Sequence, residues 1–162
     1  MVDVNKVFEE IKADEGTRNF VYRCSLGHPT IGCGHLILDT DPESKLEVFD
    51  VSAYDVPEDQ CISDHRIYEL FQEDIHLAIN ACSRIYSNWE ELPEEAQHVL
   101  VNMCFQLGQG NLTRFKNMNA AVEAQAWGQV ALEMVDSRWA RHQTPARAHR
   151  LKDRILRLCE KK

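Results

Sequence analysis

The chain has 162 residues, of which 44% are hydrophobic and 27% charged, the usual balance of a soluble globular protein. This length suits a single domain, or two small lobes sharing one polypeptide, with a substantial buried core. No apolar run approaches membrane-spanning length, which excludes an integral membrane protein. The acidic, amphipathic N-terminus MVDVNKVFEE does not read as an export signal, which favours synthesis in the cytoplasm without a signal peptide.

The net charge of −8 is distributed unevenly along the chain. Residues 137–162 contain nine Lys or Arg against two Asp or Glu, whereas the preceding 136 residues contain nine against twenty-four. A basic segment could bind nucleic acid, but this one lacks interleaved aromatics and glycines, and the overall charge opposes a polyanion. We therefore expect a solvated helix face and no nucleic-acid partner.

The six cysteines lack the paired C-x-x-C spacing that would indicate a zinc site, and they suggest no tight disulfide framework. Cys82 and Cys104 occupy apolar positions of helical patterns, where a cysteine acts as a small buried hydrophobe. Cys61 and His65 have the spacing of two ligands on one helix face, but no further ligands accompany them. The sequence therefore predicts reduced thiols and neither a metal nor another cofactor.

The first predicted helix runs from about residue 4 to 14, with Asp3 or Asn5 available as its cap. Gly16 should stop this helix, which places Glu15 at its C-terminal end. There the negative end of the helix dipole favours the protonated form of a carboxyl group, as a general acid requires.

A hairpin is predicted directly after this helix. Its strands lie around residues 20–22 and 30–31, and residues 25–29 form the loop between them. The glycines on either side of Cys33 let the backbone bend sharply before His35. The acid at the helix end would then face a small sheet.

The remainder of the chain reads mainly as helices. Residues 36–59 mix prolines, acids and broken apolar periodicity, which indicates a loop-rich insert with at most one short helix. The later expected elements are a long helix from Ser63, a helix from Pro93 to Gly108, a turn at 108–111, helices at 115–126 and 127–135, and a closing helix capped by Thr144. The predicted fold class is α+β, mostly α.

Several segments resemble the phage-type lysozymes, the peptidoglycan muramidases typified by the T-even bacteriophage endolysin. The matching segments are Glu15-Gly16, TIGCGH (30–35), NMCFQLG (102–108), and SRW (137–139) with QTPAR (143–147). The resemblance implies a lysozyme-like fold with a hairpin lobe at about 15–62, a connecting helix at about 63–86, and a helical lobe made of 87–162 and the first helix, 3–14.

The resemblance also implies roles for individual residues. Glu15 would be the general acid, and Thr30 would hold the attacking water by its hydroxyl. Cys24 stands where the family usually has an aspartate, and we expect a functional thiol there rather than one that only fills space. His35 would be structural, and Arg147 would pair with Glu15.

Substrate contacts are expected from Leu36, Phe105 and Gln106, which match cleft positions of the family. Phe105 could pack on a sugar face, although it could equally belong to the core, and Gln106 could bond the amide groups of the sugars. Met118 and Glu133 replace small polar cleft residues of the family. We expect Trp127 and Trp139 to be packing residues.

The implied activity is hydrolysis of the β-1,4 bond between N-acetylmuramic acid and N-acetylglucosamine. A monomer without metal or cofactor would act on the periplasmic cell wall after release by another factor. Two alternatives follow from the missing aspartate. One is a lytic transglycosylase, in which the muramic 6-hydroxyl attacks instead of water. The other is a non-catalytic peptidoglycan-binding or phage structural module.

Overall fold

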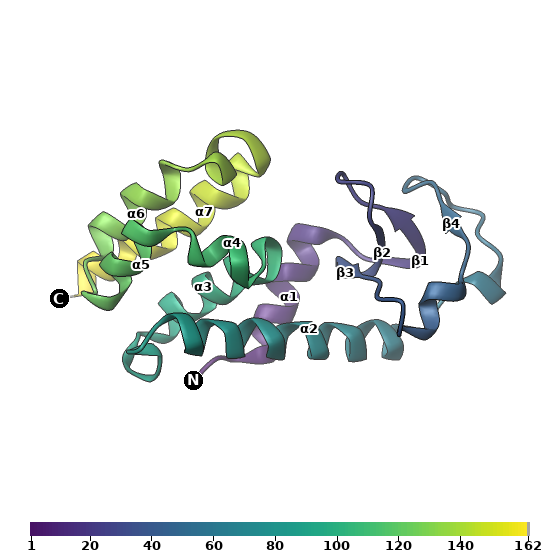
Figure 1. Cartoon of the computed structure of the whole chain (residues 1–162), viewed down its shortest axis with the longest axis horizontal. Coiled ribbons are helices and arrows are strands. Elements are labelled where there is room, and N and C mark those ends of the chain that lie inside the picture. Colours follow the sequence, from purple (N-terminus) through teal and green to yellow (C-terminus); the bar gives the residue numbers. More distant parts are fainter. Residues whose placement is uncertain (162) are drawn as a thin grey trace. The chain divides into compact units, whose positions relative to one another are not determined.

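The structure is a computed structural model that describes residues 1–161 (Figure 1). It is mostly helical with one mixed four-stranded sheet, which confirms the α+β class expected from the sequence. The chain divides into two compact units. Residues 8–74 form the sheet unit, and residues 1–7 with the chain from Ile75 onward form the helical unit. No helix within residues 1–161 is long and apolar enough to cross a membrane.

The sheet unit holds most of α1 (Val4–Glu15), all four strands and the first half of α2 (Asp64–Ile85). The strands are β1 (Arg18–Arg23), β2 (Pro29–Gly32), β3 (His35–Leu36) and β4 (Val48–Phe49), in the spatial order β3-β2-β1-β4. β1 and β2 form the predicted antiparallel hairpin, and β3 continues it. β4 pairs parallel to β1.

The two ends of α1 are set by the residues that the sequence indicated. The carboxylate of Asp3 accepts a hydrogen bond of 3.2 Å from the backbone amide of Lys6, as an N-cap does. Gly16 donates its amide to the carbonyl of Lys12 and adopts a φ of +71°, a conformation that ends a helix and favours glycine. Glu15 is therefore the last residue of α1.

The sheet packs on α2 through a small apolar core. Val21, Ile31 and Leu70 are buried there, and partly buried isoleucine and leucine side chains surround them. An ion pair joins the 3-10 helix Pro42–Lys45 to α2, because Glu43, only 4% exposed, accepts a 2.5 Å hydrogen bond from Nε of Arg66. These contacts fix the sheet on one face of α2.

The helical unit is built around α3 (Glu94–Leu107), in which residues 96–104 are all buried. A helix without an exposed face in this stretch must be covered by its neighbours. The other helices wholly in this unit are α4 (Gln109–Thr113), α5 (Lys116–Glu123), α6 (Trp127–Val135) and α7 (Pro145–Leu156). α7 buries Ala148, Leu151 and Ile155.

Two local expectations were wrong and one was right only in part. Residues 108–111 do not form a simple turn, because the chain re-enters a short helix, α4, directly after Gly108. Thr144 is the N-cap residue of α7 and precedes Pro145, as expected, but its hydroxyl makes no cap hydrogen bond and accepts one from Gln106. The insert at 36–59 contains a strand, β4. This strand is stabilised by pairing with β1, so its two residues show no sequence periodicity from which it could be predicted.

Candidate active site

Glu15 lies where α1 meets the glycine turn that precedes His35. A Cβ built on Gly34 would stand 3.4 Å from Cδ and from Oε2 of Glu15, so the carboxyl group packs directly on this turn. Gly34 has a φ of +75°, which a residue with a side chain rarely adopts. The glycine thus permits both the bend and the close approach of the acid. Glu15 is neither buried nor fully exposed, so solvent and a ligand can reach it.

Cys24 begins the hairpin loop, with its side chain turned toward the amides of that loop. Burial alone would raise the pKa of Cys24, but hydrogen bonds from the backbone amides of His28 and Leu26 lower it overall. An aspartate at this position could accept the same bonds. The thiolate of Cys24 is therefore stabilised by its own loop.

Thr30 is buried in β2, opposite Tyr22 of β1. Its hydroxyl donates a 2.9 Å hydrogen bond to the carbonyl of His28 and lies near the thiol of Cys24. That bond uses the one hydrogen of the hydroxyl, and the lone pairs of its oxygen can accept, which is what holding a water requires. On its other side, Thr30 is the register partner of Leu36, whose side chain is 53% exposed.

Tyr22 belongs to the same cluster, although the sequence did not single it out. Burial, and next the neighbouring Glu15 carboxylate, raise the pKa of Tyr22, and Cys24 acts on it in the same direction. Tyr22 and Cys24 are two residues apart along one extended segment, so they share a face. That spacing was the signal that could have identified Tyr22. Glu15, Tyr22, Cys24 and Thr30 thus gather in one region of the sheet unit.

His35 is held between two carboxylates. Its Nδ1 lies 2.7 Å from Asp74 of α2, and its Nε2 lies 2.7 Å from Asp41. Burial alone would lower the pKa of His35, but the hydrogen bonds to Asp74 and Asp41 raise it to about 9. An imidazolium that donates from both nitrogens satisfies this site, so His35 has the charge and contacts of a structural ion pair. Neither aspartate was identified from the sequence.

The other predicted site residues belong to the helical unit. The amide of Gln106 accepts a 2.9 Å hydrogen bond from the indole of Trp139 and donates one of 3.1 Å to Thr144. These bonds fix the orientation of Gln106 and leave one N–H and one lone pair of its amide for other partners. Trp139 is 2% exposed, so it packs as expected while also orienting Gln106. Phe105 is half-buried.

Arg147 is buried near the start of α7. Its Nε donates a 2.9 Å hydrogen bond to the side chain of Asn102, which is itself fully buried. This contact ties α7 to α3. The pairing of Arg147 with Glu15 stays a prediction.

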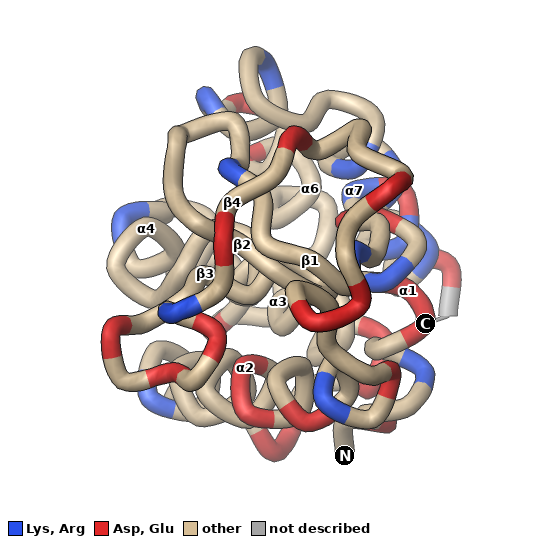
Figure 2. Tube along the Cα trace, turned by 90° about the vertical axis from the view of Figure 1, so that its right-hand side faces the viewer, with Lys and Arg blue, Asp and Glu red and all other residues tan. Residues whose placement is uncertain are grey.

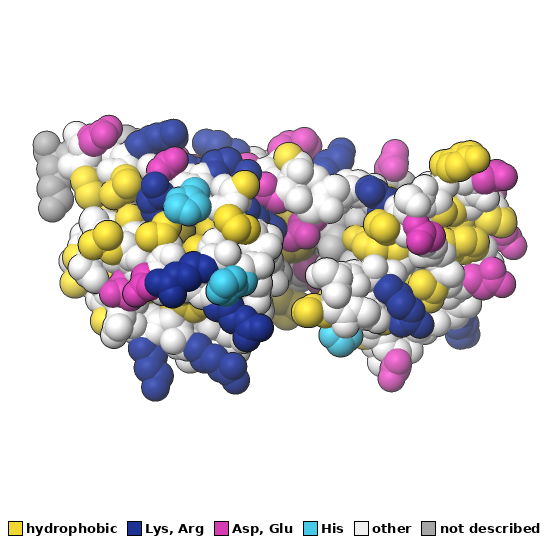
Figure 3. Space-filling model, turned by 90° about the horizontal axis from the view of Figure 1, so that it is seen from above, with side chains coloured by type: hydrophobic (Ala, Val, Ile, Leu, Met, Phe, Trp, Pro, Cys, Tyr) yellow, Lys and Arg dark blue, Asp and Glu magenta, His cyan; other side chains and the backbone are white. Residues whose placement is uncertain are grey.

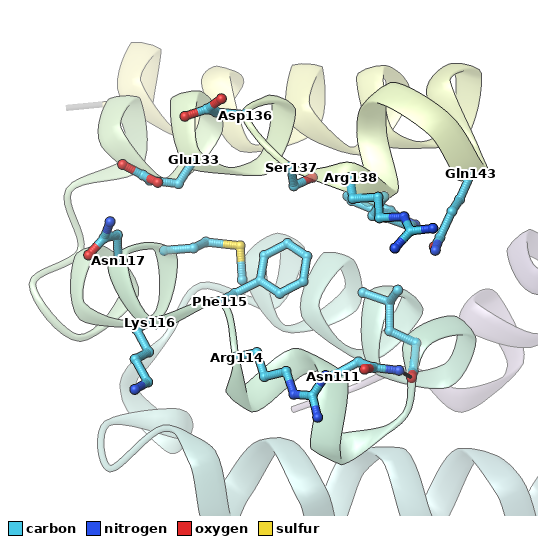
Figure 4. Close-up of a pocket in the computed structure, with 13 residues that line it drawn as sticks. Asn111, Arg114, Phe115, Lys116, Asn117, Glu133, Asp136, Ser137, Arg138 and Gln143 are labelled. Carbon is cyan, nitrogen blue, oxygen red and sulfur yellow. Dashed lines mark hydrogen bonds between the residues drawn. The ribbon is translucent and has the colours of Figure 1, made fainter.

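A cavity of about 580 Å³ opens in the helical unit (Figure 4). Its apolar lining includes Phe115 and Met118, which is only 1% exposed. Glu133 and Asp136 lie along one side, and Arg138 lies at the other end (Figure 4). Met118 and Glu133, which we expected to replace small polar cleft residues of the family, therefore line a pocket that presents charges of both signs.

The basic C-terminal segment forms part of the surface of the helical unit. Lys and Arg recur along α7 in Figure 2, and Figure 3 shows such side chains gathered over the C-terminal helices. Part of this charge is neutralised locally, because Arg141 pairs with Asp136 and Arg154 pairs with Glu95. The surface is thus a mixed one with a basic excess.

Within residues 1–161 no group of three His, Cys, Asp or Glu side chains could hold a metal ion. The thiol of Cys61 instead contacts the carbonyl of Pro57 at 3.4 Å, and His65 lies 3.9 Å from Glu69.

Comparison with known proteins places the chain in a family. Residues 12–154 match the profile of Phage lysozyme. Two proteins of Dictyostelium discoideum are similar over 91% of this chain and 92% of their own length: "Probable T4-type lysozyme 2", 31% identical, and "Probable T4-type lysozyme 1", 30% identical. "Pre-baseplate central spike protein Gp5" of Enterobacteria phage T4 is 31% identical over 91% of this chain but only 27% of its own length. The chain therefore belongs to the phage lysozyme family.

Proposed function

We propose that this protein is a muramidase that hydrolyses the β-1,4 bond between N-acetylmuramic acid and N-acetylglucosamine in bacterial peptidoglycan. The observation that carries the proposal is the position of Glu15. In a chain of the phage lysozyme family, this carboxyl group ends α1, packs on the glycine turn at Gly34 and lies near Tyr22, which in turn neighbours Cys24 and Thr30.

In the proposed reaction, protonated Glu15 gives its proton to the glycosidic oxygen as the bond from that oxygen to the anomeric carbon breaks. The anomeric carbon then carries oxocarbenium-like positive charge. A water held by the accepting oxygen of Thr30 adds to this carbon and loses a proton, which yields the hydrolysed sugar end. No metal or cofactor is needed for these steps.

Cys24 would act through its thiolate. The loop amides that lower the pKa of Cys24 increase the fraction of thiolate present near neutral pH. A thiolate beside Thr30 can take the proton from the attacking water, attack the anomeric carbon itself, or stabilise the positive charge there. These are the tasks that a carboxylate at position 24 would perform.

The proposal is tested by adding the protein to permeabilised Gram-negative cells and measuring how fast the turbidity of the suspension falls. Glu15→Gln should abolish clearing, because an amide cannot donate the proton. Asp14→Asn is the matched control, since it removes the neighbouring acid of the same helix end and should leave clearing intact. If the wild type clears no faster than Glu15→Gln, the chain is a non-catalytic wall-binding or structural module.

The thiol is tested separately. Cys24→Asp should stay active and Cys24→Ala should lose activity by roughly tenfold or more. Alkylation of thiols should inactivate the wild type but not Cys24→Asp. The control is Cys159→Ser, which removes an exposed cysteine and should be inactivated by alkylation like the wild type. Full activity of Cys24→Ala across the pH range would remove the thiol from the mechanism.

A lytic transglycosylase is the second candidate, favoured by the absence of a carboxylate at position 24. In that reaction the muramic 6-hydroxyl replaces water and leaves an anhydro end. Mass spectrometry of the released muropeptides separates the two, because reducing and anhydro ends differ by one water. Hydrolysis is our proposal, so predominantly anhydro products would contradict it.

A further inference from the structure

A second cavity of the helical unit, of about 470 Å³, lies outside the residues that carry the proposed reaction. Its lining comes from the last turn of α2, from α4 and from α5, and consists of Arg84, Ile85, Gln109, Thr113, Lys116 and Asn119. All six residues belong to the same compact unit. The lining contains two cations and no Asp or Glu, although the chain has 26 acids against 18 Lys and Arg. This hollow is therefore positive in an acidic protein.

Arg84 is held in place by a neutral partner. Its Nη2 donates a hydrogen bond of 2.8 Å to the side-chain carbonyl oxygen of Gln109. That bond uses one of the five N–H groups of the guanidinium, and Arg84 forms no ion pair with the residues that the structure describes. The amide nitrogen of Gln109 keeps both of its N–H groups for another partner. A guanidinium and an amide fixed next to each other can donate to one oxyanion.

Lys116 is the first residue of α5, where a cation does not stabilise the helix, because the N-terminal end of the helix dipole is positive. The side chain is exposed, and in the described part of the chain its ammonium group pairs with no carboxylate. Lys116 also lines the cavity of 580 Å³, but Figure 4 shows its side chain directed away from Phe115 and Glu133. Neither helix stability nor an ion pair accounts for this lysine, whereas an anionic ligand would.

The other polar groups of the lining are largely occupied. The hydroxyl of Thr113 donates a 2.8 Å hydrogen bond to the carbonyl of Gln109. The side-chain amide of Asn119 is engaged at both ends, with a tyrosine hydroxyl at 2.6 Å and a backbone carbonyl at 2.9 Å. The unused hydrogen-bonding capacity of the cavity therefore lies mainly in the N–H groups of Arg84, Gln109 and Lys116. A positive lining that is rich in donors suits an oxyanion.

We propose that this cavity binds the phosphate monoester of a sugar-sized molecule. A phosphate monoester carries a charge of about −1.5 to −2 at pH 7, which matches the two cations. Arginine binds two phosphate oxygens through its planar fork, and lysine binds as a point charge. Ligand sites typically have volumes of about 300 to 1,000 Å³, and this cavity is far larger than a bare phosphate, so a neutral body linked to the phosphate would fill the rest beside Ile85. The inference is independent of the reaction proposed for Glu15.

The experiment is isothermal titration calorimetry of the full-length protein at low ionic strength, because salt screens exposed charges. The probes are glucose 6-phosphate and N-acetylglucosamine 6-phosphate, with glucose and inorganic phosphate for comparison. We expect both esters to bind, inorganic phosphate to bind more weakly, and glucose not to bind. Failure of both esters to bind would overturn the proposal. Inorganic phosphate that binds as tightly as the esters would overturn the assignment to an ester.

Substitution of the two cations tests whether the esters bind in this cavity. Arg84→Gln and Lys116→Gln should each weaken binding by about tenfold or more, since each removes a charge-assisted hydrogen bond. Lys6→Gln is the matched control, because it removes the same charge from an exposed lysine of α1 outside the cavity and should leave binding unchanged. Equal weakening by all three variants would indicate a general effect of charge and overturn the site, as would unchanged binding by both cavity variants.

Nuclear magnetic resonance of the wild type gives a second readout that needs no variant. The backbone amide signals of Gln109, Thr113 and Lys116 should shift as either ester is added, because these residues line the cavity. Shifts confined to residues outside the lining would place the ester elsewhere and overturn the proposal.

Discussion

The charged cluster around His35 makes the stability of the sheet unit dependent on pH. The pKa of His35 rises from 6.5 to about 9 because Asp74 and Asp41 hold its protonated form. One pKa unit corresponds to about 1.4 kcal/mol, so this rise contributes about 3 kcal/mol to the free energy of unfolding. His35→Asn removes the titrating group and should lose this contribution.

The sign of the dependence follows from the direction of each shift. Because folding raises the pKa of His35, its contribution is fully present below about pH 6.5 and disappears as pH rises through about 9. Burial would raise the pKa of Asp41, but hydrogen bonds from Leu38 and His35 lower it overall, so its contribution is lost as pH falls below about 3.9. The free energy of unfolding of the wild type should therefore exceed that of His35→Asn by the largest amount between about pH 4 and 6.5.

The assay is urea unfolding followed by circular dichroism at about pH 5.5 and about pH 10. The difference between wild type and His35→Asn should shrink by about 3 kcal/mol between these values. His65→Asn is the matched control, because the side chain of His65 is 82% exposed beside Glu69. Its free energy of unfolding should differ little from that of the wild type at either pH. A constant difference for His35→Asn across this range would refute the assignment of a buried imidazolium.

Three further predictions follow from the structure. Gly34→Ala should lower the rate of wall hydrolysis by roughly tenfold or more, because a side chain is strained at a φ of +75° and relief of this strain would shift a turn in direct contact with Glu15. Gly27→Ala, with a similar φ but no atom within 4 Å, should leave the rate unchanged. Glu43→Gln should lower the free energy of unfolding in urea by about 1 to 2 kcal/mol, since it removes the buried carboxylate that pairs with the partly exposed Arg66, and a loss under about 0.5 would contradict this. The clearing rate should change little from low to physiological salt, because a net charge of −8 gives no long-range attraction to an anionic wall; a steep fall would implicate the basic C-terminal surface.

The ends of individual helices could be predicted from the sequence. Asp3 and Gly16 set the ends of α1 because capping and left-handed backbone conformations depend on single residue types. For the same reason the position of Glu15 at the helix end could be predicted. Gly108 likewise ends α3 with a φ of +84°.

What the sequence did not reveal depends on contacts between distant positions. Asp74 follows His35 by 39 residues, and nothing local to either residue indicates that they meet. Cys82 and Cys104 were each predicted to be buried, and both are. The hydrogen bond between Gln106 and Thr144 likewise joins positions 38 residues apart and could not be predicted from either segment alone.

The sheet of residues 8–74 ends in a two-residue strand on each side. β3 and β4 are its edges, and Val48 of β4 stands between Glu47 and the nearby Asp50. Short edges flanked by charge offer few free backbone groups for another chain to pair with. The exposed Leu36 and Val48 on these strands would otherwise favour edge-to-edge aggregation. The architecture of the sheet thus guards against β-sheet polymerisation while apolar side chains stay at its surface.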